Sequence, residues 1–597
     1  MRRHYGEPCA SHGGDQERRH GHADRSTRPH DLLPVTGASA EGTALCRHAH
    51  LLVAAVLRGR CVVGIGTHRY VAADYQARAA RARRRRRLQC TGAWGGSDEG
   101  RGPVLIGVDI GQSACKVTAL RADGTIAGER NASYPTHHPH PGWAEQNPDD
   151  WTAAADRACR ELMATLGDRA QIEGVGVTAA AHHGVILDAS RTVIRPCILL
   201  SDGRAADEAA ELERRHGDKI LARGRNRITA GWTLAHLRWL ALHEPEAWSR
   251  VRHVLFAKDY VRSSLTGDNV TDWIEAEGSL LLNAATRRWD DLLCELVPID
   301  RAALPAIVAP EQVVGHVTSV AAARTGIPEG TPVVAGCSDT AAEAYAAGAI
   351  APRQGVVKIA TAGNVNVMTE HPLPSPRYFT YSHPIPGLSY HAVATNSAAS
   401  SRSWLQHVLG TESGDQYAEL DREMESVAPG SDGLLFHPYL LGERAPCFDV
   451  TLRASFVGIA AHHTRGHLLR AVLEGVALSL ADCADVAKRA GLEFDEARLL
   501  GGGSRSRLWA QITADAIGRP LLRPSLTDAS CGAALLAGVG AGVFSSIREA
   551  AERCSRVVER IEPDAQRAAG YARLLEIYRA VREEIAPFAR ALREVTF

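Results

Sequence analysis

The chain has 597 residues, enough for roughly two to four domains, and 45% of them are hydrophobic, which is typical of a soluble globular protein. Its formal net charge of zero conceals an asymmetry, because residues 1–100 hold 17 arginines, no lysine and 9 acidic residues, which leaves a mildly acidic body. The acidic body gives no electrostatic reason to expect binding to nucleic acid. No apolar run approaches the roughly 18 residues of a membrane span. The 13 cysteines include no CxxC pair, which indicates a reducing, cytoplasmic setting.

Residues 1–100 differ in composition from everything that follows. They include "RARRRRRLQC" and show little sustained periodicity. A basic arm for nucleic acid or a membrane and a targeting peptide are both open interpretations. We favour a disordered or spurious extension, because 63 arginines against 5 lysines suit a GC-rich genome, in which an upstream start codon appends Arg- and Ala-rich sequence.

From Val104 the chain alternates predicted strands and helices. "VLIGVDIG" and "KVTALRADGTIAGERNASYP" predict a strand, a turn and a strand, "DDWTAAADRACRELMATLG" an amphipathic helix, and "IEGVGVTAA" a buried strand. A second strand–turn–strand begins at Gln354, and a strand, Gly-rich turn and helix begin at Ala497. The body is therefore predicted to be α/β, with an internal duplication into domains 104–350 and 353–590.

Asp109 ends the first apolar strand of the body. Ligands bind at the carboxyl ends of strands in α/β sheets, and the turn formed by Gly111, Gln112 and Ser113 offers backbone and side-chain donors to an anion. The carboxylate suits Mg²⁺ held through water. The alternative is an ordinary hairpin in which Asp109 caps the turn.

Asp339 lies between the strand "PVVAG" and an Ala-rich helix. Considered alone, this position favours a simple helix N-cap, and a general base meeting a ligand hydroxyl is the second interpretation.

Two further turns are candidate anion sites. "ATAGN", with Thr361, follows the strand "VVKI", and Gly501, Gly502 and Gly503 precede a predicted helix. The chain has no GxxxxGK[ST], no Rossmann GxGxxG and no GxSxG elbow, so P-loop, dinucleotide and α/β-hydrolase chemistry are disfavoured.

Histidines and one aspartate complete the candidates. His182 and His183 follow the strand "GVGVTAAA", where a structural role is the commoner outcome, and Asp202 lies in "LSDGR", which is also compatible with a polar turn.

In order and spacing, these segments resemble the FGGY family of carbohydrate kinases over roughly 104–590, and within it the xylulokinases. The segments that carry the resemblance are "GVDIGQSACKV", "HPHPGWAEQNPDDW", "RPCILLSDGR", "FAKDYVRSSLTG", "PVVAGCSDTAAEAYAAG", "FHPYLLGERAP", "RAVLEGVALSL" and "LLGGGSRSRLWAQITAD".

The resemblance implies two duplicated actin-like (ribonuclease H-like) domains with an interdomain cleft, ATP and Mg²⁺ as cofactors, and phosphate transfer from ATP to a small sugar, D-xylulose first. It implies a cytoplasmic enzyme that is compatible with a homodimer and has no nucleic-acid or membrane partners. The implied roles are Asp339 as the base, Asp109 near the metal, phosphate or nucleotide contacts from Gly111, Gln112, Ser113, Lys116, Thr361, Gly363, Gly502 and Gly503, and sugar contacts from His182, Asp202 and Thr340.

Several residues depart from the xylulokinase pattern. Ala180-Ala181 replace Gln-Met, Leu200-Ser201 replace Trp-Asn, and Thr340 replaces Asn. Ala360 and Ala362 change the second phosphate loop from Gly-Thr-Ser. The catalytic carboxylates are kept while the sugar pocket differs, so ribulose, erythritol and glycerol stay open as substrates. An actin- or chaperone-like ATPase and a silent sugar-binding regulator are the competing classes, and retention of both Asp109 and Asp339 argues against the regulator.

Overall fold

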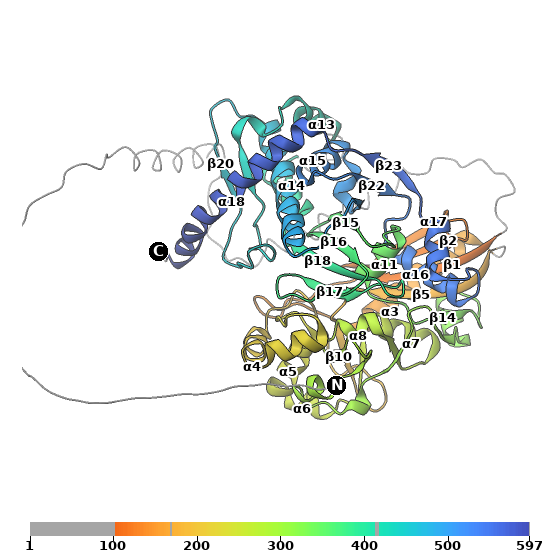
Figure 1. Ribbon diagram of the computed structural model, residues 1–597. Coiled ribbons are helices and arrows are strands. Elements are labelled where there is room, and N and C mark those ends of the chain that lie inside the picture. Colours follow the sequence, from red (N-terminus) through yellow and green to blue (C-terminus); the bar gives the residue numbers. More distant parts are fainter. Residues whose placement is uncertain (1–101, 168–169, 412–416, 596–597) are drawn as a thin grey trace, which may run out of the picture. The chain divides into compact units, whose positions relative to one another are not determined.

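The computed structural model describes residues 102–167, 170–411 and 417–595. The predicted basic extension of residues 1–100 lies outside the described residues. The described body is α/β and contains two large mixed sheets, one built from residues before position 350 and one from residues after it (Figure 1). The α/β class is therefore confirmed, while the domain boundaries at 104–350 and 353–590 remain a proposal.

The first large sheet has the strand order β13-β14-β5-β1-β2-β3. β1 and β2 form an antiparallel hairpin, and β5 runs parallel to β1 on its other side. The strands are β1 (Pro103–Ile110), β2 (Ala114–Arg121), β3 (Ile126–Ser133), β5 (Gln171–Ala179), β13 (Val313–His316) and β14 (Pro332–Val334).

The second large sheet has the order β17-β18-β16-β15-β21-β22-β23 and repeats this plan. β15 and β16 form an antiparallel hairpin, and β21 runs parallel to β15. The predicted echo at Gln354 and Ala497 is thus a real topological repeat. The strands are β15 (Gln354–Ile359), β16 (Gly363–Thr369), β17 (Phe379–Ser382), β18 (Ser389–Thr395), β21 (Glu496–Leu500), β22 (Leu521–Pro524) and β23 (Val557–Ile561).

Helices cover both large sheets, and short two-stranded pairs form outside them. The helices are α3 (Pro148–Leu166), α4 (Ala206–Gly224), α5 (Thr233–His243), α6 (Pro245–Ser249), α7 (Ala257–Thr266), α8 (Trp273–Glu277), α9 (Asp291–Glu295), α10 (Ser319–Thr325), α11 (Asp339–Ala346), α12 (Ala399–Val408), α13 (Tyr417–Ser426), α14 (Arg465–Arg489), α15 (Arg507–Ile517), α16 (Ala529–Gly540), α17 (Ile547–Cys554) and α18 (Ala565–Glu594). The short pairs are β4 (Glu145–Gln146) with β7 (Cys197–Ile198), β6 (Gly184–Leu187) with β8 (His253–Phe256), β9 (Val270–Asp272) with β12 (Ala306–Val308), β10 (Leu282–Asn283) with β11 (Arg288–Trp289), and β19 (Leu435–His437) with β20 (Ser455–Val457).

Helix α16, late in the chain, packs directly on the first sheet (Figure 1). Glycines make this contact close: a Cβ atom at Gly107 of β1 would overlap the Ser530 carbonyl, and one at Gly176 of β5 would overlap the Ala533 carbonyl. Absence of a side chain at these two positions lets backbone approach backbone. Helix α16 lies against the strand "IEGVGVTAA", and this close contact accounts for the glycine at position 176.

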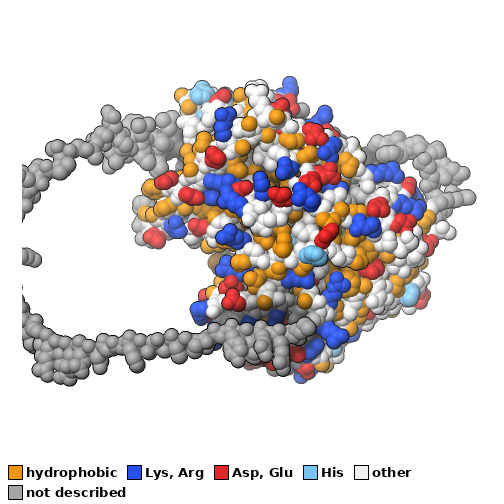
Figure 2. All heavy atoms as spheres, in the orientation of Figure 1, with side chains coloured by type: hydrophobic (Ala, Val, Ile, Leu, Met, Phe, Trp, Pro, Cys, Tyr) orange, Lys and Arg blue, Asp and Glu red, His pale blue; other side chains and the backbone are white. Residues whose placement is uncertain are grey.

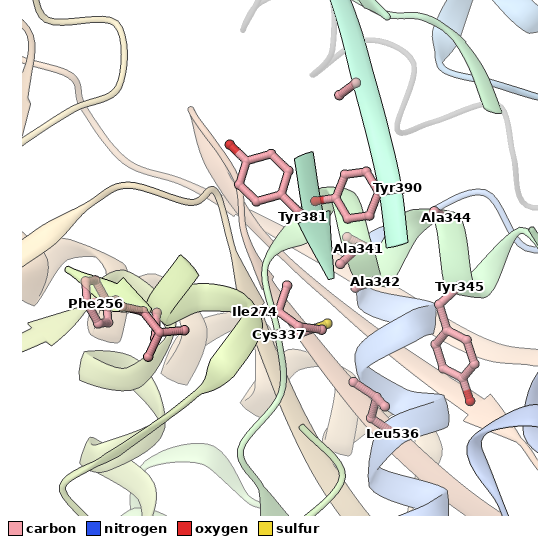
Figure 3. Close-up of a cluster of buried hydrophobic side chains, with 14 of the residues drawn as sticks. Phe256, Ile274, Cys337, Ala341, Ala342, Ala344, Tyr345, Tyr381, Tyr390 and Leu536 are labelled. Atoms are coloured by element: carbon pink, nitrogen blue, oxygen red, sulfur yellow. The ribbon is translucent and has the colours of Figure 1, made fainter. Parts of the chain in front are cut away.

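Helices α11 and α16 contribute many small residues to a buried core that also includes residues of both large sheets. Ala341, Ala342 and Cys337 lie between Leu536 of α16 and the aromatic rings of Tyr381 and Tyr390 (Figure 3). The Ala-rich sequence after Asp339 was predicted to be a good helix former, and here it also allows α11 and α16 to pack closely. This core fixes the start of α11, where the candidate base lies.

Candidate active site

Strand register brings the two predicted catalytic aspartates to one end of the first sheet. Asp109 in β1 pairs with Thr178 of β5, and the next β5 residue, Ala179, forms a parallel bridge with Ser338. The Thr178 hydroxyl also donates a 2.6 Å hydrogen bond to the Cys337 carbonyl. Asp339 therefore emerges two strands from Asp109, at the same sheet edge.

Asp339 is the first residue of α11, and Ser338 occupies the N-cap position without a side-chain cap bond. The N-cap interpretation of Asp339 was therefore wrong. Its carboxylate instead accepts a 2.6 Å hydrogen bond from the Thr340 amide and a 3.1 Å bond from the Thr340 hydroxyl. Burial raises the pKa of Asp339, while the positive charge of Lys358 opposes the rise. Both contacts use the same carboxylate oxygen, Oδ1.

Lys358 of β15 contributes a cation that the sequence analysis missed. Its ammonium lies 2.6 Å from a carboxylate oxygen of Glu343 in α11. The same charge lowers the pKa values of Asp109 and Asp339, both of which burial raises. The signal was present in the sequence, because "QGVVKIATAG" places one lysine in an otherwise apolar strand. Lys358 thus balances an acidic cluster assembled from both halves of the body.

The surroundings of Asp109 fit a hydrated Mg²⁺. Its Oδ1 is buried and has no hydrogen-bond partner, and burial followed by the charge of Asp528 raises its pKa well above the usual value. No group of three or more His, Cys, Asp or Glu side chains with metal-binding geometry occurs in the described ranges. Mg²⁺ typically takes only one or two protein carboxylates and fills its shell with water and phosphate oxygens, which matches this arrangement.

The tip of the β1–β2 hairpin exposes Gln112 and Ser113, as a phosphate-contacting turn requires. The Lys116 ammonium is differently placed: it lies 2.8 Å from Glu129 and 2.8 Å from Asp528, the N-cap residue of α16. Lys116 therefore ties the first hairpin to α16 in this structure. The Thr118 and Ser530 hydroxyls, 2.7 Å apart, reinforce the same join.

The second candidate phosphate turn, residues 360–362, joins β15 to β16. Thr361 is exposed, and its carbonyl accepts hydrogen bonds from the backbone at the start of α12, including one from the Ala398 amide. Gly363 is buried in β16, where a Cβ atom would crowd Thr395 and Leu480. Thr361 is thus the member of this predicted pair that faces solvent.

The glycine turn after β21 opens a 3₁₀ turn, Gly502–Arg505, and α15 begins only at Arg507. The predicted order of strand, Gly-rich turn and helix is therefore confirmed, with a 3₁₀ turn between the glycines and α15. A Cβ atom at Gly502 would meet no other atom within 4 Å, whereas one at Gly503 would clash with Ile359. Gly502 lies beside open space that a nucleotide could enter, and Gly503 is a packing residue.

His182 follows β5 in the left-handed region, with φ of 74°. Its Nδ1 lies 2.5 Å from the Gly278 carbonyl and its Nε2 lies 3.2 Å from the Tyr381 hydroxyl. The Trp232 ring meets the imidazole edge to face at 4.2 Å. Burial lowers the pKa of His182 to about 4, so the imidazole is neutral at pH 7. Tyr381 and Trp232 had no recognisable sequence signal.

Asp202 is buried and fully hydrogen bonded. It accepts bonds from the Ala144 amide at 2.6 Å and from the Arg204 guanidinium at 2.7 and 2.9 Å. The Arg204 guanidinium in turn stacks 3.6 Å above the Trp143 ring. Asp202 is therefore part of a packed network with the segment "HPHPGW", and Thr340 is hydrogen bonded to Asp339. Of the three residues predicted to contact the sugar, His182 is the one that lies against aromatic rings.

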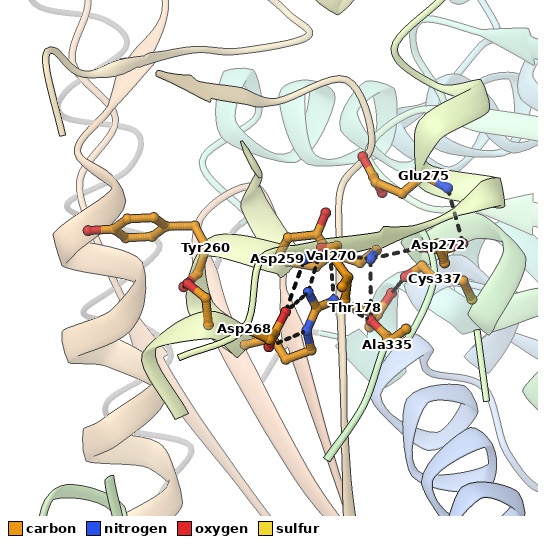
Figure 4. Close-up of polar contacts among 12 residues, drawn as sticks. Thr178, Asp259, Tyr260, Asp268, Val270, Asp272, Glu275, Ala335 and Cys337 are labelled. Carbon is orange, nitrogen blue, oxygen red and sulfur yellow. Dashed lines mark hydrogen bonds and ion pairs between the residues drawn. The ribbon is translucent and has the colours of Figure 1, made fainter. Parts of the chain in front are cut away.

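A buried ionic network supports the loop that carries Asp339 (Figure 4). Lys258 lies 2.8 Å from Asp272, and the Arg262 guanidinium donates a 2.9 Å hydrogen bond to the Ala335 carbonyl. Glu275, in the short helix α8 that follows Asp272, has both carboxyl oxygens buried without a hydrogen-bond partner, and burial raises its pKa well above the usual value. Its carboxyl group points away from Asp272 (Figure 4).

Comparison with known proteins decides the family. Residues 104–346 match the N-terminal domain of the FGGY family of carbohydrate kinases, and residues 355–541 match its C-terminal domain. The chain belongs to the FGGY family of carbohydrate kinases. It is an ATP-dependent carbohydrate kinase, as the resemblance of its motifs implied.

Several xylulose kinases are among the proteins similar to this chain. It is 31% identical to the xylulose kinase of Bacillus subtilis over 80% of this chain and 96% of that protein, and 33% identical to the one of Escherichia coli over 81% and 99%. The structure of the xylulose kinase from Rhodospirillum rubrum superposes with a TM-score of 0.74 at 33% identity, covering 81% of this chain and 99% of that one. The predicted duplicated, actin-like FGGY fold is thereby confirmed.

Within the described residues, none of the helices has both the length and the apolar character needed to cross a membrane. Lys, Arg, Asp and Glu side chains are interspersed on the face shown in Figure 2. The homodimer allowed by the resemblance stays a prediction.

Proposed function

We propose that this FGGY kinase converts D-xylulose to D-xylulose 5-phosphate, with Asp339 as the general base. The observation that carries the proposal is the placement of Asp339 and Asp109 at one sheet edge. The similar proteins that support it are xylulose kinases, and the similarity covers nearly the full length of each.

Asp339 accepts the proton of the primary hydroxyl as that oxygen attacks the γ-phosphorus of ATP. The bond from the γ-phosphorus to the β,γ-bridging oxygen breaks, ADP leaves, and the proton later passes from Asp339 to solvent. Lys358 favours the ionised form that a base needs, because its charge lowers the pKa of Asp339. Positioning and charge neutralisation supply most of the acceleration in phosphoryl transfer, so one base is sufficient.

Asp109 is the residue we assign to Mg²⁺, through water, since its Oδ1 is buried and unpartnered. When bound, Mg²⁺ neutralises charge on the ATP phosphates. The exposed Gln112, Ser113 and Thr361 are assigned to phosphate contacts, and the open space beside Gly502 to the adenosine.

The test is a coupled ADP-release assay with Mg-ATP across D-xylulose, D-ribulose, L-ribulose, L-xylulose, erythritol and glycerol, with Asp339→Asn as the inactive control. We expect the highest kcat/KM with D-xylulose. Preference for another sugar would keep the kinase and reject D-xylulose, which would place specificity in Ala180, Ala181, Ser201 and Thr340. Steady ATP hydrolysis that no sugar stimulates would overturn sugar transfer itself.

A further inference from the structure

Lys358 lies near the carboxyl end of β15, shortly before the turn 360–362 to which phosphate contacts are assigned. Its neighbour across the hairpin is Asn364 of β16, and residues directly opposite in an antiparallel pair present their side chains on the same face. That face is turned toward α11, because the Lys358 ammonium reaches Glu343. Lys358 therefore projects from the second sheet toward the helix that begins with the candidate base.

The helix α11 offers two carboxyl groups on the side that meets Lys358. Asp339 and Glu343 are four residues apart, about one helical turn, so they lie on the same face of α11. The ammonium donates a 2.6 Å hydrogen bond to Glu343, while its charge also acts on Asp339 and Asp109. Lys358 is therefore close to both predicted catalytic aspartates.

Part of the Lys358 side chain stays accessible to a ligand. Its exposed fraction is 27%, and Asp109, Asp339 and the turn 360–362 are also partly exposed. An ammonium has three N–H donors, and within the described part of the chain Glu343 is the acceptor that it reaches. Two donors therefore remain for a group that enters from solvent.

The chemistry of the ammonium suits a phosphoryl group. Burial opposes a charge on Lys358, but the carboxyl groups of Glu343 and Asp339 outweigh it and raise the pKa, so the ammonium stays protonated. A phosphoryl group in transfer carries negative charge on its non-bridging oxygens, and lysine acts on such a group as a point charge. The turn 360–362 adds one polar side chain, the hydroxyl of Thr361. A cation beside this turn supplies the charge that the turn lacks.

We propose that Lys358 is a catalytic residue whose ammonium donates hydrogen bonds to the non-bridging oxygens of the γ-phosphoryl group, in bound ATP and during transfer. The inference rests on the proposed function with Asp339 as the base, and it holds for any sugar acceptor. The hydroxyl oxygen forms a bond to the γ-phosphorus while the bond to the β,γ-bridging oxygen breaks. ADP keeps that electron pair, the hydroxyl proton passes to Asp339, and Lys358 keeps its own proton throughout.

The first test measures the kcat of Lys358→Met across pH at saturating ATP and sugar. Loss of a charged donor to the transferring group should lower kcat by about 10²- to 10³-fold at every pH. A lysine that only favours ionisation of Asp339 would matter at low pH alone, so recovery of the wild-type kcat at high pH would overturn the proposal. Lys219→Met, at an exposed position of α4, is the matched control and should behave as wild type.

The second test measures nucleotide binding without turnover. Calorimetry with Mg²⁺ compares the Kd of ADP with that of AMP-PNP, an ATP analogue whose terminal phosphoryl group resists transfer. Lys358→Met should weaken the binding of AMP-PNP by about tenfold, the loss of one charge-assisted hydrogen bond, and leave the Kd of ADP near that of wild type. Equal weakening of both nucleotides, or of neither, would contradict a contact with the γ-phosphoryl group.

Glu343→Gln separates the contact from a structural role. This substitution removes the ion pair to α11 but keeps the ammonium, so it should be far less impaired in kcat than Lys358→Met. If the pair served only as a strut between the two halves, both variants would lose kcat equally, and the proposal would be rejected. Lys358→Gln, which keeps a polar side chain, replaces Lys358→Met if the latter does not fold. If wild type phosphorylates no sugar, the proposed function has failed, and the AMP-PNP comparison still tests Lys358.

Discussion

The ammonium of Lys358 lies 2.6 Å from a carboxylate oxygen of Glu343, and this ion pair joins β15 of the second sheet to α11, which starts with the candidate base. Lys358 lies within electrostatic reach of Asp109 and Asp339 as well, and its charge lowers the pKa of each. The cation that opposes the rise in the pKa values of these carboxyl groups therefore comes from the half of the body opposite to the two aspartates.

Asp339→Asn should abolish sugar phosphorylation. The amide keeps the shape of the side chain but cannot accept the hydroxyl proton, so we expect kcat to fall by about 10²- to 10⁴-fold while ATP binding is retained. ADP release and nucleotide titration by calorimetry measure the two effects. Asp207→Asn, an exposed aspartate in the first turn of α4, is the matched control and should match wild type. Substantial turnover by Asp339→Asn would remove the base role.

Lys358→Met should shift the acid limb of the pH–rate profile to higher pH. Lys358 opposes the burial that raises the pKa of Asp339, so its loss raises that pKa further and the base ionises only at higher pH. The profile of kcat/KM against pH measures the shift. Lys219→Met, at an exposed position of α4, should leave the profile unchanged. An unshifted midpoint in Lys358→Met would contradict the assigned electrostatic role.

Glu275→Met should stabilise the protein. The carboxyl is buried with both oxygens unpartnered, and replacing an unsatisfied polar group by an apolar one of similar size should raise the free energy of unfolding by about 1–3 kcal/mol. The pKa of Glu275 is raised above the ordinary 4.5, so its folded form favours the proton. Protonated Glu275 therefore adds to the free energy of unfolding; this contribution is complete below about pH 4.5 and is lost as pH rises through the raised pKa of the folded state.

Denaturant unfolding at several pH values measures this effect. The stability advantage of Glu275→Met should increase as pH rises above 4.5, the ordinary value for Glu. Glu277→Gln is the contrasting variant, because the Glu277 carboxylate accepts two hydrogen bonds from Ser382 and should lose stability on substitution. A destabilised Glu275→Met would mean that Glu275 has a partner which water supplies.

Removal of residues 1–101 should leave kinase activity intact. Every candidate site residue lies after position 108, and the match to the FGGY N-terminal domain begins at residue 104. We expect the chain 102–597 to keep the kcat and KM of the full-length protein, measured side by side by ADP release. A soluble but inactive 102–597 would show that the extension contributes to the site.

The sequence predicted the parts of this protein that depend on neighbouring residues. "VLIGVDIG" folds as β1 and "QGVVKI" as β15, because apolar runs broken by glycine turns form hairpins. The sequence also placed Asp109 at the end of a strand and Asp339 between a strand and a helix, whereas strand register brought the two to one sheet edge. The order of the motifs was enough to identify the FGGY family.

The tertiary structure alone decided which side chains meet across the two halves. Tyr381 and His182 are 199 residues apart, and no local pattern links them. Lys358 lies in a strand whose side chain could face either way, and only packing on α11 sets it against Glu343. Asp202, in contrast, has a sequence context typical of a sugar ligand but is fully hydrogen bonded to Arg204 and Ala144. Backbone preference acts over a few residues, whereas a site between two sheets depends on contacts that form only when distant segments pack together.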